Sequence, residues 1–164
     1  MTQARRRWVP VLAAAAVALL VAALGGAVTD TGEWYQALKK PSWQPPGWLF
    51  APAWTLIYAL TAASFVVAWR HARDPGLRRL IIQLFAINAF FNVAWSVLFF
   101  HFRRPDWALL EVALLWLSIL MLIVLLARIS RTASRLLVPY ILWVSFAAIL
   151  NLAVVRLNYP FQAL

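Results

Sequence analysis

The sequence contains no cysteine and few charged residues, and both shortages exclude whole classes of protein. Without Cys in its 164 residues, the chain has no disulfides, thiolate metal sites or cysteine nucleophiles. Cysteine usage therefore gives no information on the redox state of its compartment. Only 12% of the residues are charged, whereas an ordinary soluble domain has about 25%. Because a small soluble domain has too much surface to cover with so few charges, most apolar side chains must face lipid.

The charges that are present are mostly basic. The chain has 15 Lys and Arg against five acidic residues, and its net charge of +10 accompanies a hydrophobic content of 65%. Nucleic-acid-binding proteins are also basic, but here the arginines lie in short clusters between apolar runs and not along one soluble face. The pattern favours contact with an anionic lipid surface and excludes a nucleic-acid partner.

Five apolar segments are long enough to span a bilayer as helices. A span needs about 20 mainly apolar residues, because lipid offers no hydrogen-bond partner to open backbone. Arginines or prolines mark most of the boundaries. The sequence therefore predicts an all-α membrane protein, a bundle of five transmembrane helices in a single domain (1–164), with helices over about 9–28, 48–69, 79–102, 107–127 and 136–157.

The first apolar segment has a second interpretation. Arg5–Arg7, an apolar stretch and the small residues Gly25–Ala27 are also the features of a secretory signal peptide. We favour a retained helix, because the apolar stretch exceeds the usual length of about 7 to 15 residues and a short amphipathic loop follows it.

The distribution of Lys and Arg predicts the orientation of the helices. Ten of the 15 lie at the N-terminus, in the second loop and in the fourth loop, and five lie on the other side. The positive-inside rule then places the N-terminus in the cytoplasm and the C-terminus outside, in an integral, multi-pass protein.

The first loop, residues 29–47, is the longest connection, and we call it the lid loop. Thr31 is expected to cap a short helix from Glu33 to Leu38, whose ends match the helix dipole. Three prolines then force extended backbone. A flexible linker would be rich in Gly and Ser, so this loop is expected to be a stiff, packed cover, although Trp and Tyr also gather at membrane interfaces regardless of function.

The lid loop and two helices resemble one family. The first-loop signature of the TspO family (translocator protein, tryptophan-rich sensory protein) is similar to the run Trp34-Tyr35, Leu38, Lys40–Trp43, Pro45–Gly47 and Pro52–Trp54. Phe91-Asn92 with Trp95 resembles the third helix of that family, and Val138–Tyr140 with Trp143 resembles the start of its fifth. The resemblance extends, in order, over nearly the whole chain.

The resemblance implies a ligand pocket enclosed by the second, third and fifth spans and the lid loop. In that family the pocket binds porphyrins and related tetrapyrroles, and in animal members cholesterol and synthetic drugs. A homodimer is also implied, and small residues such as Ala59 and Ala63 would let helices approach closely. The expected ligand-binding residues are Trp34, Tyr35, Trp43, Pro45, Trp54, Tyr58, Asn92, Trp95, Phe99, Tyr140, Trp143 and Ala147.

Spacing supports parts of this pocket but leaves alternatives open. Asn88 and Asn92 share a helix face, and either amide can serve an interhelical hydrogen bond instead of a ligand. Aromatic stripes are usually core, yet a flat apolar ligand needs wide ring faces with a few polar groups. The propionates of a porphyrin would find cations on the lid side among Lys39, Lys40, Arg103 and Arg104, which otherwise are solvated boundary charges.

The sequence shows no set of titratable groups that would converge on a catalytic or metal site. His71 and His101 fall on opposite membrane faces, although His101 as an axial haem ligand stays an alternative. Asp106 and Glu111 are expected to be interfacial charges. No catalytic residue, metal site or resident cofactor is predicted, and porphyrin or haem enters only as a ligand.

The expected function is a membrane receptor or sensor that binds tetrapyrroles and adjusts pigment or stress metabolism. One alternative is a light-dependent porphyrin-degrading enzyme, in which ring tryptophans take part as electron donors. Another is a transporter of tetrapyrroles or other small hydrophobic molecules, although no inverted repeat or buried coupling charge favours it. A scaffold without a small-molecule ligand is a further alternative. For a sterol ligand the sequence points both ways: Leu152 stands where the cholesterol pattern of animal members has Tyr, whereas Arg135, Tyr140 and Leu142 match the reversed pattern.

Overall fold

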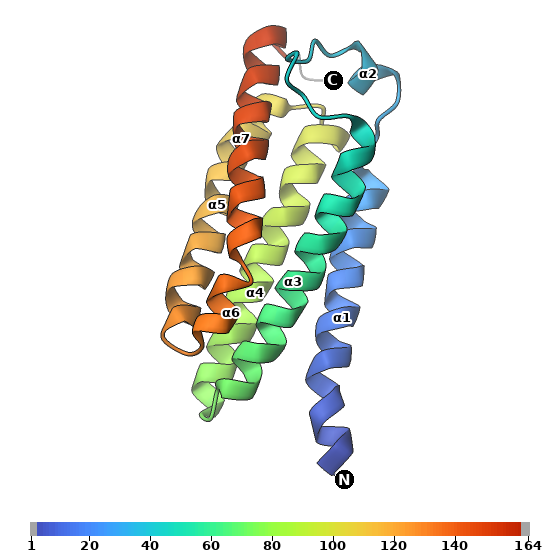
Figure 1. The fold of residues 1–164 in the computed structure, drawn as a ribbon. Helices are drawn as coiled ribbons and strands as arrows, with labels where there is room; N and C mark the ends of the chain where they lie inside the picture. Colours follow the sequence, from blue (N-terminus) through green and yellow to red (C-terminus); the bar gives the residue numbers. More distant parts are fainter. Residues whose placement is uncertain (1–2, 162–164) are drawn as a thin grey trace.

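A computed structural model describes residues 3–161, which form a bundle of five long helices (Figure 1). Each long helix has the length and apolar composition of a membrane span, so the prediction of a five-helix membrane bundle is confirmed. The protein is therefore an integral, multi-pass membrane protein. The helical elements are α1 (Gln3–Val28), α2 (Glu33–Ala37), η1 (Gly47–Leu49), α3 (Phe50–His71), α4 (Pro75–Ser96), η2 (Val97–His101), α5 (Pro105–Ala127), α6 (Arg131–Arg135) and α7 (Val138–Asn158).

Local sequence sets several helix ends. Asp74 caps α4 by accepting a hydrogen bond from the Leu77 backbone N–H at 2.8 Å, and Pro75 occupies the first turn, where a missing N–H costs nothing. Pro105 begins α5 in the same way. The expected cap at Thr31 is wrong: Gly32 precedes α2, and Asp30 accepts the Gly32 N–H instead.

α5 is the most buried of the five long helices. It contacts α4, α6 and α7, while α1 contacts α3 and α4, so the order around the bundle is α1, α3, α7, α5, α4. Ile119, Leu122 and Leu126 of α5 are fully buried. Polar groups tie the helices together because lipid offers them no partner: Ser64 of α3 donates to the Ala133 carbonyl at 2.7 Å.

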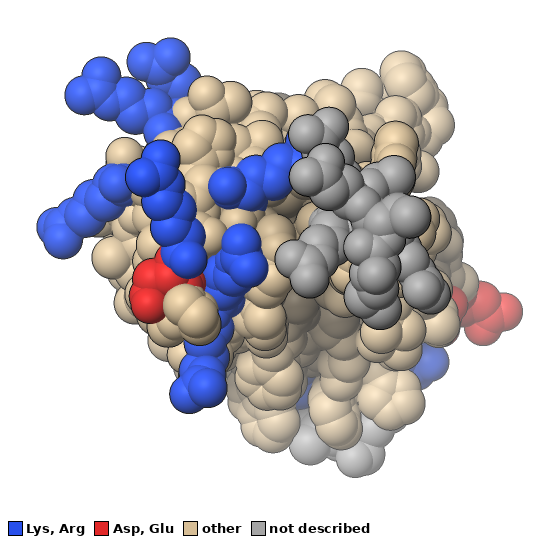
Figure 2. All heavy atoms as spheres, turned by 90° about the horizontal axis from the view of Figure 1, so that it is seen from below, with Lys and Arg blue, Asp and Glu red and all other residues tan. Residues whose placement is uncertain are grey.

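The two ends of the bundle differ in structure and charge. The lid loop, with α2, covers one end beside the C-terminal end of α7, and the N-terminus lies at the other (Figure 1). Figure 2 shows Lys and Arg side chains gathered on the end opposite the lid. Among the described side chains, the exposed arginines of that end lie where α3 ends and α4 begins and between α5 and α7: Arg70, Arg73, Arg78, Arg79, Arg128, Arg131 and Arg135.

The helix continues beyond Ser96, the last residue of α4, but with a different hydrogen-bond pattern. After Ser96 the chain continues as a π-helix, η2, and then Arg103 adopts φ 53° before α5 begins. A non-glycine residue with positive φ is uncommon and strained. The π-helix and this turn together set the positions of Phe99, Phe100 and Arg103 beneath the lid loop.

Candidate functional site

Three groups of the expected ligand-binding residues come together in the structure. The first lies where α3, α4 and α7 meet. Asn92 donates from Nδ2 to the Tyr140 hydroxyl and accepts at Oδ1 from the Tyr58 hydroxyl, both at 3.0 Å. Trp54 stacks on Tyr58 with ring centroids 5.4 Å apart and meets Tyr140 edge-on. This network joins three spans through one amide.

The second group lies under the lid loop. Trp95 stacks on Phe99 at 5.1 Å, and Trp34 of α2 meets Phe99 edge-on at 6.1 Å. Tyr35 packs against Phe100 at 5.7 Å. The lid loop is therefore attached to η2 by ring contacts, as expected for a packed cover and not for a flexible linker.

The third group joins the lid loop to α7. Trp143 contacts Phe146 at 5.6 Å and Phe50 at 5.7 Å, and Trp43 meets Phe146 at 6.1 Å. The remaining two expected residues, Pro45 and Ala147, are partly buried. Trp143 packs against the same hydrophobic core as Trp54 and Tyr140, so the third group adjoins the Asn92 network.

Cations lie over aromatic rings at the lid. Lys40 Nζ is 4.1 Å from the centroid of the Tyr35 ring, and the Arg103 guanidinium is 5.9 Å from that of Trp34. Burial raises the pKa of the Tyr35 hydroxyl, partly offset by a hydrogen bond to Gln44. Tyr35 thus stays neutral near neutral pH, and Lys40 faces a π-system and not a phenolate. Arg104 pairs with Asp106.

Three buried polar side chains have no hydrogen-bond partner within residues 3–161. They are Trp95, through its indole N–H, Glu111, through both carboxyl oxygens, and Thr61, through its hydroxyl. Ala108, one turn before Glu111, packs with Phe99 and Trp95. The expectation that Glu111 is interfacial is wrong, because its side chain is only 8% exposed. Buried hydrogen-bond donors and acceptors without partners lower the stability of a native structure, and they mark places where a ligand can form hydrogen bonds.

Asn88 has the interhelical partner that the packing interpretation predicts. Its Nδ2 donates to Ser118 Oγ of α5 at 2.9 Å, and Ser118 in turn donates to the Leu115 carbonyl. Asn88 therefore connects α4 to α5, whereas Asn92 connects α4 to α3 and α7.

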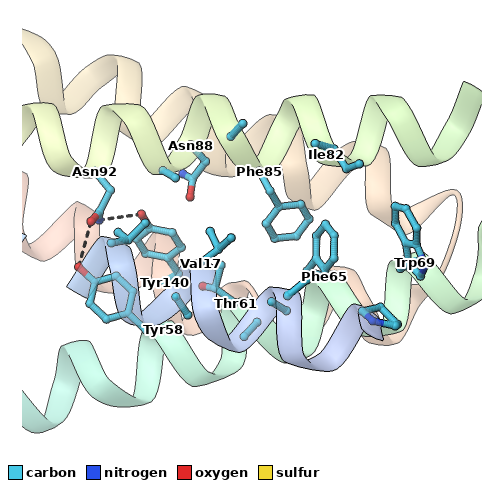
Figure 3. Close-up of a pocket in the computed structure, with 18 of the residues that line it drawn as sticks. Val17, Tyr58, Thr61, Phe65, Trp69, Ile82, Phe85, Asn88, Asn92 and Tyr140 are labelled. Atoms are coloured by element: carbon cyan, nitrogen blue, oxygen red, sulfur yellow. Dashed lines mark hydrogen bonds between the residues drawn. The ribbon is translucent and has the colours of Figure 1, made fainter. Parts of the chain in front are cut away.

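A cavity of about 820 Å³ extends from the Asn92 network away from the lid (Figure 3). Its walls come from α1, α3 and α4, and Tyr140 of α7 closes one end. The participation of α1 is not apparent from the sequence, in which its Ala, Val and Leu residues distinguish no face. Of the twelve expected ligand-binding residues, the cavity is lined by Tyr58, Asn92 and Tyr140.

Comparison with known proteins agrees with this architecture. Residues 13–157 match the model of the TspO/MBR family. The chain is 38% identical over 125 residues (76% of this chain, 79% of the relative) to the tryptophan-rich protein TspO of Chlorobaculum tepidum. It is 34% identical over 134 residues (82% of each chain) to the tryptophan-rich sensory protein of Cereibacter sphaeroides. It is 34% identical over 146 residues (85% of this chain, 86% of the relative) to the translocator protein of Sus scrofa. The chain therefore belongs to the TspO/MBR family.

Proposed function

We propose that the protein is a membrane receptor or sensor that binds a tetrapyrrole on the lid side of the bundle. The observation that carries the proposal is the ring-lined region under the lid loop. There Trp95, whose indole N–H is unpaired, stacks on Phe99, and the unpaired Glu111 lies one turn after Ala108, which packs with both rings. A flat apolar ligand with inner N–H groups and ring nitrogens matches wide ring faces with one donor and one acceptor.

The charges at the lid support the same ligand class. Lys40 and Arg103 lie at the lid end of the bundle, over the rings of Tyr35 and Trp34. A porphyrin placed under the lid would keep its ring among the aromatics and direct its propionates toward these cations. The name of one relative, tryptophan-rich sensory protein, fits a role in which occupancy of the site is the signal.

The orientation and the assembly belong to this proposal as well. The arginine-rich end would face the cytoplasm and the lid would face outside, following the positive-inside rule. Ala59 and Ala63 are exposed on one side of α3, where small side chains would let a second copy approach closely, as a homodimer requires.

A titration of the purified protein with protoporphyrin IX in the dark tests binding. The expected result is a saturable change in the porphyrin absorption band, with one porphyrin bound per chain in lipid nanodiscs. A change that rises linearly with porphyrin, and equally in empty nanodiscs, would show partition into lipid and would contradict the proposal.

Two follow-up measurements separate the receptor from its alternatives. Porphyrin breakdown products that form only under illumination, and only with protein present, would favour the degrading enzyme. Accumulation of porphyrin against a gradient in sealed vesicles would favour a transporter, the activity that the name of another relative, translocator protein, suggests.

A further inference from the structure

The cavity between α1, α3 and α4 differs in chemistry from the ring-lined region under the lid. One end holds the Tyr58–Asn92–Tyr140 network. The middle is mainly apolar: Phe65 and Phe85 line it in edge-on contact with each other, and its polar exception is Thr61 (Figure 3). The other end is closed by Trp69 and Arg78. Arg78 is the single charged residue in the lining.

The cavity is long. Arg78 and Asn92 both line it from α4 and are 14 positions apart, which corresponds to about 21 Å along a helix with a rise of 1.5 Å per residue. That length is about two thirds of the roughly 30 Å hydrocarbon core of a bilayer. An elongated apolar space of this kind matches an extended hydrocarbon chain.

Arg78 is placed to receive an anion at the membrane surface. It lies in the first turn of α4, at the arginine-rich end, with its guanidinium 5.0 Å from the Trp69 ring centroid. Its Nε donates to the Ala72 carbonyl at 3.1 Å, and within the described part of the chain it forms no ion pair. The nearby carboxylate of Asp74 is occupied in capping α4. The terminal guanidinium groups of Arg78 remain available for a charge-assisted hydrogen bond.

The cavity is open toward lipid. Val9 and Val17 of α1 and Ile82 of α4 line it, yet they are 59%, 54% and 49% exposed. Figure 1 shows the N-terminal half of α1 separating from α3, while near its other end Gly25 lies close to Tyr58 and Ser96. A molecule in the leaflet can therefore enter between α1 and the bundle without crossing the lid.

From these features we infer that the cavity binds one hydrocarbon chain of an amphiphile with an anionic headgroup, the chain between α1 and α4 and the headgroup on Arg78. Two sources share this chemistry: a free fatty acid, and one acyl chain of an anionic phospholipid. A porphyrin, with two propionates, fits less well, because one cation lines the cavity. The inference is independent of tetrapyrrole binding under the lid.

Photolabelling in nanodiscs of zwitterionic lipid tests this inference. The probes are a palmitic acid analogue with a diazirine in its chain, its methyl ester, and a phosphatidylglycerol that carries the same labelled chain. We expect saturable labelling of α1 and α4 peptides by an anionic probe and nonsaturable labelling by the ester. Saturation by the acid identifies a fatty-acid site, and saturation by the phospholipid alone identifies a lipid site.

Matched variants make the test decisive. Arg78→Gln should raise the half-saturating concentration about tenfold, the effect of losing one charge-assisted bond. Arg79→Gln, the exposed neighbour that does not line the cavity, should leave it unchanged. Ala86→Phe narrows the cavity and should reduce labelling, whereas Ala113→Phe on the exposed face of α5 should not.

Equal labelling of the Arg78→Gln and Arg79→Gln variants, or equal saturation by acid and methyl ester, would overturn the inference. The dark porphyrin titration on the same preparations keeps the two proposals apart. Lost photolabelling with intact porphyrin binding would refute only the amphiphile site, and the reverse result would refute only the tetrapyrrole site.

Discussion

Lys39 in the lid loop and Asn158 at the C-terminal end of α7 exchange two hydrogen bonds across 119 positions of the chain. The Lys39 N–H donates to Asn158 Oδ1, and Asn158 Nδ2 donates to the Lys39 carbonyl, each at 2.8 Å. The ring contacts of Trp34 and Trp43 hold the same loop on either side. The side chain of Asn158 therefore fastens the lid to α7 through two hydrogen bonds to the backbone of Lys39.

Replacing Asn158 should loosen the lid without unfolding the bundle. Asn158→Ala removes both bonds, each worth about 1 kcal/mol, so the Lys39 amide should exchange its hydrogen at least several-fold faster. Amide exchange followed by mass spectrometry measures this directly. Ser42→Ala, at an exposed position in the same loop, is the control, and equal exchange in the two variants would show that Asn158 does not fasten the lid.

Ser64 should be intolerant of substitution where α3 meets α6. It is fully buried and donates to the Ala133 carbonyl at 2.7 Å. Ser64→Val both adds volume and leaves that carbonyl unpaired, so it should lower the free energy of unfolding by about 1 to 3 kcal/mol. Thermal unfolding in detergent is the measurement. Thr55→Val, at an exposed site whose hydroxyl bonds within its own helix, should change it by less than about 0.5 kcal/mol.

The positive φ of Arg103 predicts an unusual order of stability among its variants. Arg103→Gly and Arg103→Ala both remove the cation near Trp34, but only glycine relieves the strain of a φ of 53°. The glycine variant should therefore be more stable than the alanine variant by about 1 kcal/mol. An alanine variant as stable as the glycine variant would mean that this turn relaxes freely.

The absence of cysteine permits a direct test of orientation. Ser42→Cys in the lid loop and Thr132→Cys in α6 each introduce a single exposed thiol, at opposite ends of the bundle. With the lid outside, a membrane-impermeant maleimide should label Ser42→Cys in sealed right-side-out vesicles and should label Thr132→Cys only after lysis. The opposite pattern would refute the positive-inside assignment.

Much of the architecture could be predicted from the sequence, because hydrophobic length is a direct signal for membrane spans. The five apolar segments correspond to the five long helices, and the one-turn spacing of Asn88 and Asn92 placed both amides on an inward face. The aromatic composition of the lid loop likewise indicated a packed cover, which its contacts with Phe99 and Phe146 confirm.

Other features of the structure correspond to no recognisable pattern in the sequence. The π-helix at Val97–His101 and the turn at Arg103 depend on how α4 joins α5, and no turn residue such as glycine marks them. Glu111 is buried by tertiary packing although it lies near a helix end. The cavity wall on α1 is equally hidden, because residues that face the cavity and residues that face lipid are both apolar.

The dissociation constant of protoporphyrin IX in two matched variants tests the central claim most directly. Trp95, which stacks on Phe99 and carries an unpaired indole N–H, belongs to the proposed site, whereas Phe90 is 67% exposed on the outside of α4. Trp95→Ala should weaken binding by about 1 to 3 kcal/mol, and Phe90→Ala should leave it unchanged, as followed by tryptophan fluorescence quenching in nanodiscs. Equal affinity in both folded variants and the wild type would contradict the placement of the tetrapyrrole on the lid side of the bundle.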